Sequence, residues 1–208
     1  RSRLIFMYKR ALLINKNGKE FSGWTTESFK PTTGELIFNT GMTGFVEMLS
    51  DPSYVNQILS FTSSHIGNYG ISDLDFESST PKINAAVGNT FSYKASSWRS
   101  LRSIPEWLKE NHIPFCDGFD SREIARHISE YGSSMFALGV DIDSSELKNL
   151  LSKSRNIIGD NSALTAGSHN KDLTYPKGKI GILDLGTKNS IINVLLNNDN
   201  LYYFYVSF

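Results

Sequence analysis

The sequence has 208 residues, of which 39% are hydrophobic, and its 21 basic and 21 acidic side chains give a formal net charge of zero. This length is enough for one large domain, or for one domain and part of another, and the charge balance argues against a nucleic-acid partner. The single cysteine excludes an internal disulfide framework and a multi-cysteine zinc site, and no apolar run has the length of a membrane span or a secretory signal, so we expect a soluble cytoplasmic protein without a membrane partner.

The first part of the chain is predicted to be mainly β. The chain starts with Arg1, whereas Met7 begins a more natural opening, so residues 1–6 are expected to be extraneous. A strand at residues 11–14 and a second strand entering at Phe21 are separated by Asn17 and Gly18, a pair typical of a hairpin turn. Further short apolar runs separated by Gly, Pro and Asn predict strands at 36–38, 58–61 and, more weakly, 85–87.

Three short helices are predicted after these strands. Each begins with a Ser or Asp three residues before a Glu, the pattern of a capping box: Ser103 and Glu106, Asp120 and Glu123, Asp143 and Glu146. Pro105 suits the first turn of the first helix, and Gly132 is expected to end the second helix as a left-handed C-cap. Apolar residues at helical spacing should face the core in the second and third helices: Ile124, Ile128, Leu147, Leu150 and Leu151.

The composition divides the chain into three parts. Residues 7–154 form the predicted α+β domain, mainly β with short capped helices, and the polar, aperiodic residues 155–178 are typical of a linker. Residues 179–208 predict a β-α-β unit: a buried strand, a tight turn at Gly186, an amphipathic helix and an aromatic strand. The chain is expected to be truncated just inside this second, α/β domain.

One long stretch resembles a known family. "GELIFNTGMTGFVEMLSDPSYVNQILSFTSSHIGNYGI" closely resembles the signature region of the small subunit, or fused amidotransferase half, of glutamine-dependent carbamoyl-phosphate synthetase. The likeness continues through "DFES", "SIPEWLKENHIPFCDGFDSREIARHISEYG" and "KIGILDLGTKNSIINVLL", and covers about residues 7–196. Departures from the family pattern occur at Ser63 and Ser64, at Ser121 and in "SSMFALGV".

The resemblance implies a glutamine-hydrolysing component. Residues 179–208 would begin its class I amidotransferase domain, and the whole enzyme would hydrolyse glutamine through a cysteine thioester. Ammonia would pass to a synthetase portion, either a separate large subunit or a fused domain, that makes carbamoyl phosphate from bicarbonate and two MgATP. This part of the chain would bind no cofactor of its own, and the sequence leaves open whether the product serves pyrimidine or arginine synthesis.

Ser53 is the one substrate-binding residue that the resemblance implies. In this family the serine of an Asp-Pro-Ser-Tyr turn reaches glutamine, and the turn is present here as "DPSY" from Asp51. Pro52 restricts φ at the bend, and a hydroxyl both donates to and accepts from a zwitterionic amino acid. The alternative is that Ser53 only closes a turn, which would be the better interpretation of an isolated "DPS".

No catalytic residue or metal ligand is expected in this chain. Cys116 lacks the small neighbours that a nucleophile at a strand-to-helix elbow requires, so we interpret it as a small buried hydrophobe. His65 is expected to be hydrogen-bonded within a turn rather than to contact a ligand. His112, His127 and His169 have no metal-ligand spacing, and no local carboxylate pair is placed for acid-base catalysis.

Parts of the sequence are compatible with two other classes of function. "ILDLGTKNS" also resembles the first phosphate loop of actin-like ATPases, but that fold requires a β-hairpin next, whereas the residues from Lys188 onward have helical spacing. A non-catalytic interaction module on the same scaffold is the second alternative. A G-x-C-x-G turn followed by a His and a Glu in the rest of the protein would favour the hydrolase over that module.

Overall fold

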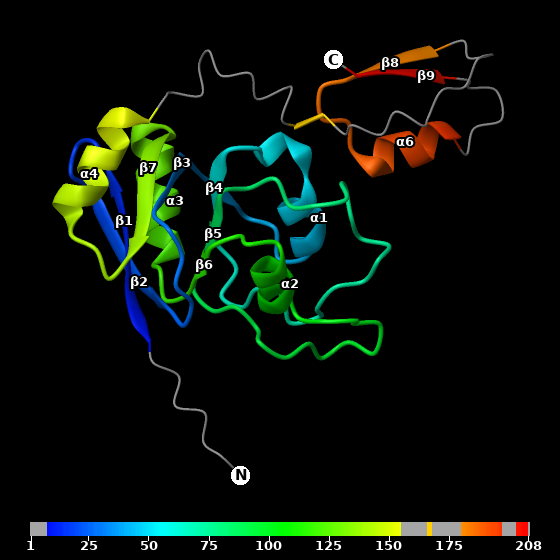
Figure 1. Ribbon diagram of the computed structural model, residues 1–208. Helices are drawn as coiled ribbons and strands as arrows, with labels where there is room; N and C mark the ends of the chain where they lie inside the picture. Colours follow the sequence, from blue (N-terminus) through cyan, green and yellow to red (C-terminus); the bar gives the residue numbers. More distant parts are fainter. Residues whose placement is uncertain (1–7, 155–165, 168–179, 197–202, 208) are drawn as a thin grey trace.

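The chain folds into a mixed α/β structure with two sheets (Figure 1). This computed structural model describes residues 8–154, 166–167, 180–196 and 203–207. The strands are β1 (Lys9–Asn15), β2 (Glu20–Thr25), β3 (Thr32–Asn39), β4 (Gln57–Phe61), β5 (Ala85–Val87), β6 (Phe115–Cys116), β7 (Ser134–Val140), β8 (Ile180–Asp184) and β9 (Tyr203–Ser207). The helices are α1 (Phe45–Ser50), the 3-10 helix η1 (Pro52–Tyr54), α2 (Ile104–Glu110), α3 (Ser121–Tyr131), α4 (Ser144–Lys153) and α6 (Asn189–Leu196).

The larger sheet has seven strands in the order β2-β1-β7-β3-β4-β5-β6. The neighbours from β2 to β3 are antiparallel, and those from β3 to β6 are parallel. Strand β7 lies between β1 and β3, although it follows them by about a hundred residues. The three predicted helices do follow the predicted strands β1 to β5, but two further strands that were not predicted, β6 and β7, alternate with α2, α3 and α4.

The predicted hairpin between β1 and β2 is confirmed. Ile14 pairs with Glu20, and the amide of Asn15 donates to the carbonyl of Lys19 at 3.1 Å. Gly18 has a φ of 84°, a value that glycine adopts without steric cost. The Asn-Gly pair therefore sets the register that places Ala11 and Leu13 on one face of the sheet and Leu12 on the other.

The two ends of the seven-stranded sheet meet, so the sheet curls towards closure. Trp24, in β2, and Asp117, just after β6, exchange two backbone hydrogen bonds of 2.8 Å. The Asp117 carboxylate is fully buried and accepts from the amide of Phe91 at 2.5 Å and the hydroxyl of Tyr93 at 3.1 Å. Burial raises the pKa of Asp117, and these two hydrogen bonds oppose part of that effect.

Each face of this sheet is covered by helices. One face packs against α3 through Ile124 and Ile128, together with Phe119. On the opposite face, α4 covers β1 and β7, while α1 and α2 cover β4 to β6 (Figure 1). Burial on both faces explains why consecutive residues of β1 and β4 are apolar, as is typical of strands between two layers.

The predicted helix caps are confirmed in part. Ser103 and Glu106 form both hydrogen bonds of a capping box. Asp120 accepts from the amide of Glu123, whose carboxylate pairs with Lys19 at 2.6 Å instead of completing the box. Two details are wrong: Asp143 makes no side-chain capping bond within the described structure, and Gly132 combines φ 81° with ψ 168°, outside the left-handed helical region.

Residues 180–196 and 203–207 contain a second, smaller sheet and the helix α6. Strands β8 and β9 pair in parallel, and α6 connects them in sequence, as the predicted β-α-β pattern requires. Most of the predicted linker, and the ends of the chain, lie outside the described residues. Among the described helices, none combines the length and apolar character that crossing a membrane requires.

Candidate functional site

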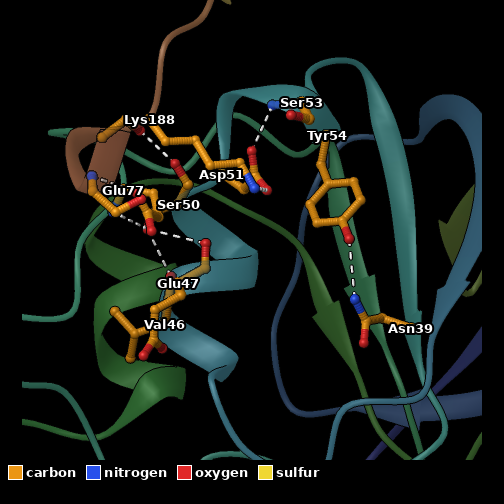
Figure 2. Close-up of polar contacts among 11 residues, drawn as sticks. Asn39, Val46, Glu47, Ser50, Asp51, Ser53, Tyr54, Glu77 and Lys188 are labelled. Atoms are coloured by element: carbon orange, nitrogen blue, oxygen red, sulfur yellow. Dashed lines mark hydrogen bonds and ion pairs between the residues drawn. The ribbon is translucent and has the colours of Figure 1, made fainter. Parts of the chain in front are cut away.

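The turn that carries Ser53 begins where α1 ends. The backbone amide of Asp51 donates to the carbonyl of Met48 at 3.4 Å, and Pro52 opens the 3-10 helix η1. The Asp51 carboxylate accepts from the amide of Ser53 at 2.9 Å (Figure 2). The side chain of Asp51 and the ring of Pro52 therefore specify this turn without help from the Ser53 hydroxyl.

The Ser53 hydroxyl is available for a ligand. Residue Ser53 is exposed, and its hydroxyl makes no hydrogen bond to any other residue in the described part of the chain. A hydroxyl that supports neither its own turn nor a neighbour is free both to donate and to accept. The Ser53 backbone amide thus closes the turn with the Asp51 side chain, whereas the Ser53 hydroxyl takes no part in it.

Tyr54 anchors the other end of η1. Its side chain is half-buried against the core beside α1, and its hydroxyl accepts from the Asn39 side-chain amide at 3.0 Å (Figure 2). The Asn39 amide oxygen in turn accepts from the backbone of Gly41 at 2.7 Å. Asn39 ends β3, so these bonds connect the Ser53 turn to the large sheet, a role that no local sequence pattern indicates.

A second turn approaches the first one from residues 180–207. Lys188 lies 2.5 Å from the second carboxylate oxygen of Asp51, and this hydrogen bond is the main cause that raises the pKa of Lys188. Gly186 has a φ of 107°, and a Cβ atom there would lie 3.1 Å from the Cβ of Pro52. A side chain at residue 186 would be strained at this φ and would need its neighbours to shift, so glycine favours the close approach of the two turns.

Acidic groups surround this junction on the α1 side. One carboxylate oxygen of Glu47 is buried and has no hydrogen-bond partner among the described residues. Burial raises the pKa of Glu47, and the nearby negative charges of Asp75 and Glu77 raise it further. Lys188 and these carboxylates give the junction a mixed charge, which is compatible with a ligand that carries both signs.

The other candidate residues do not join this site. Cys116 is fully buried in the core, and burial raises the pKa of its thiol, as expected for a structural cysteine. His65 is exposed beside the Ser64 hydroxyl at 3.2 Å, and His127 packs against aromatic rings. No cluster of metal ligands occurs among the described residues, and His169 lies outside them.

The turn at Asp184 does not continue as an actin-like phosphate loop. The Asp184 carboxylate accepts from the amides of Gly186 and Thr187 at 2.9 and 2.8 Å, and the chain then enters α6. Strands β8 and β9 are parallel, whereas a hairpin would make consecutive strands antiparallel. This part of the structure therefore disfavours the ATPase alternative.

The fold and the site define a mixed α/β protein in which Asp51 and Pro52, in the turn that carries Ser53, contact the first turn of a β-α-β arrangement. A sequence model of the family described as "Carbamoyl-phosphate synthase small chain, CPSase domain" matches residues 13–138, more than half of the chain. The chain belongs to this family.

Several curated relatives carry the same description. The chain is 40% identical over 152 residues to the carbamoyl phosphate synthase small chain of Nostoc sp., covering 73% of this chain and 39% of that protein. It is 34% identical over 191 residues to the small chain of Staphylococcus saprophyticus, covering 91% of this chain and 52% of that protein. It is 38% identical over 195 residues to the pyrimidine-specific small chain of Bacillus subtilis, covering 90% of this chain and 51% of that protein. The chain thus spans about half the length of these relatives, or less.

Proposed function

We propose that this chain is the N-terminal part of the glutamine-hydrolysing component of a carbamoyl-phosphate synthetase, and that Ser53 binds glutamine. The single observation that supports this most strongly is the exposed Ser53 hydroxyl, which has no hydrogen-bond partner among the described residues and directly follows Asp51 and Pro52, the two residues that contact a second turn, in a chain of the small-chain family. The β-α-β unit at residues 180–207 would begin the amidotransferase domain, so the site would lie where the two domains meet.

The chemistry of the site suits an amino-acid substrate. The α-ammonium and α-carboxylate groups of glutamine require, respectively, an acceptor and a donor, and one hydroxyl supplies both. We propose that the remaining steps occur outside this chain. The catalytic cysteine would lie in the rest of the amidotransferase domain, and a large synthetase subunit or fused domain would use bicarbonate and MgATP.

A direct test compares this chain with the whole protein. The 208-residue chain should release no glutamate from glutamine above background, because its one cysteine is fully buried and its thiol pKa is raised. The whole protein, assayed with its synthetase portion, should form carbamoyl phosphate from glutamine. Cys116→Ser should leave that activity in place.

Two results would contradict the proposal. Glutamate release by the 208-residue chain that Cys116→Ser abolishes would place the nucleophile in this chain. A whole protein that never hydrolyses glutamine, but still binds a synthetase, would instead be the non-catalytic interaction module. Ammonia-dependent synthesis by the same preparation is the control, because it shows that the synthetase portion is active.

A further inference from the structure

Residues 76–77 contact the beginning of α6 through three hydrogen bonds. The backbone amide of Asn189 donates to the carbonyl of Glu77 at 2.9 Å, and its side-chain amide donates to the carbonyl of Phe76 at 3.1 Å. The amide of Ser190 donates to the Glu77 carboxylate at 2.9 Å. A segment of the first domain therefore caps a helix of the second unit.

Capping of this kind has a clear physical basis. The first N–H groups of a helix have no partner within the helix, and the helix dipole favours a negative charge at this end. Helices usually satisfy these groups with a side chain from the residue just before the helix. In α6 the carboxylate comes from Glu77, more than a hundred residues earlier in the chain, so the cap also fixes the position of the helix.

The same segment is fixed on its other side to the turn that carries Ser53. The amide of Glu77 donates to the Ser50 hydroxyl at 2.9 Å, and the Ser78 hydroxyl donates to the Ser50 carbonyl at 2.6 Å. Ser50 is fully buried, and its hydroxyl donates to the carbonyl of Val46 (Figure 2). Since Ser50 directly precedes Asp51, Glu77 lies between the end of α1 and the start of α6.

We propose that Glu77 is a positioning residue for glutamine use, which holds the first helix of the second unit in register with the Ser53 turn. The Lys188–Asp51 pair joins the same two parts through one ion pair, in which the Lys188 side chain is 37% and the Asp51 side chain 9% exposed. The cap by Glu77 is directional and fixes an orientation. Its effect on glutamine rests on the proposed function; its effect on α6 does not.

The test uses three variants of the whole protein: Glu77→Ala, Glu77→Gln and, as a control, Glu130→Ala. Glu77→Ala removes the acceptor for Ser190, so hydrogen exchange in the first turn of α6 should accelerate, and the KM for glutamine should rise by about twofold to tenfold, the effect of one hydrogen bond. Glu77→Gln keeps an acceptor oxygen and should restore both values to near wild type. Glu130 is exposed on α3, and its loss should change neither.

Ammonia-dependent synthesis should be unchanged in all three variants, because it bypasses the glutamine site. Faster exchange in Glu77→Ala with an unchanged KM would overturn the positioning role, and unchanged exchange would overturn the cap itself. Failure of the proposed function would give a different result. In that case Ser53→Ala would leave the KM for glutamine unchanged, whether or not hydrogen exchange in α6 responds to Glu77→Ala.

Discussion

Phe45→Ala is expected to lower the free energy of unfolding by about 3–5 kcal/mol, because it removes a fully buried aromatic ring from the centre of the core beside α1. The Phe45 ring packs edge-on against the ring of Phe61, with 5.5 Å between the ring centroids, and is stacked on the ring of Tyr69, with 5.7 Å between the centroids. Its backbone amide also donates to the Tyr69 hydroxyl at 2.6 Å. Because α1 ends at the Ser53 turn, this core also supports the candidate site.

Thermal and urea unfolding of the 208-residue chain would measure this loss, with a fall of roughly 6–20 °C in Tm expected. Met42→Ala is a suitable control, since Met42 precedes α1 and is 79% exposed. Its effect should stay within about 0.5 kcal/mol. A Phe45→Ala variant as stable as the control would show that α1 does not pack on the core as described.

Ser53→Ala should raise the KM for glutamine by between a few-fold and about a hundredfold in the whole protein. The lost hydrogen bond contributes about 0.5–1.5 kcal/mol with a neutral partner and up to roughly 3 kcal/mol with a charged one. The turn should survive, because Asp51 and Pro52 specify it and the hydroxyl has no partner among the described residues. Ammonia-dependent synthesis should therefore change little.

Comparing the kinetics of Ser53→Ala with glutamine and with ammonia as the nitrogen source distinguishes the possible outcomes. Equal losses with glutamine and ammonia would mean that Ser53 acts through folding or domain contact. Unchanged kinetics with both would remove it from the glutamine site. Ser129→Ala, at an exposed position on α3, is the matched control and should not affect either reaction.

The elements that the sequence predicted correctly depend on local signals. The hairpin follows from Asn17 and Gly18, and the start of α2 follows from Ser103 and Glu106. The β-α-β unit follows from the change in spacing of its apolar residues, from a continuous run typical of a buried strand to the spacing of a helix. Each of these signals lies within the element or next to it. Local patterns of this kind can be recognised without knowledge of the tertiary structure.

The position of β7 could not be predicted in the same way. "SMFALGV" forms the strand between β1 and β3, and its place is set by pairing with residues far earlier in the chain. Helix α1 was also missed, because its six residues are too few for a clear helical period. Its packing on the aromatic core stabilises it instead.

The residues of the candidate site also differ in whether a local sequence pattern indicates them. Ser53 was proposed from resemblance to a family, on a motif that is contiguous in sequence. Its supporting residues Asn39, Glu77 and Lys188 were missed because each acts across the fold, on a partner at least fifteen residues away. Glu77 lies in "DFES", a motif that contributes to the resemblance, but no local pattern indicates that it caps α6.

A structure of the whole protein with glutamine bound would test the central claim most directly. The proposal predicts the Ser53 hydroxyl oxygen at about 2.6–3.2 Å from the α-ammonium or α-carboxylate group of glutamine. It also predicts that the turn from Asp51 to Tyr54 keeps its present bonds to Lys188 and Asn39. Glutamine bound in the amidotransferase domain with the Ser53 hydroxyl facing solvent would contradict it.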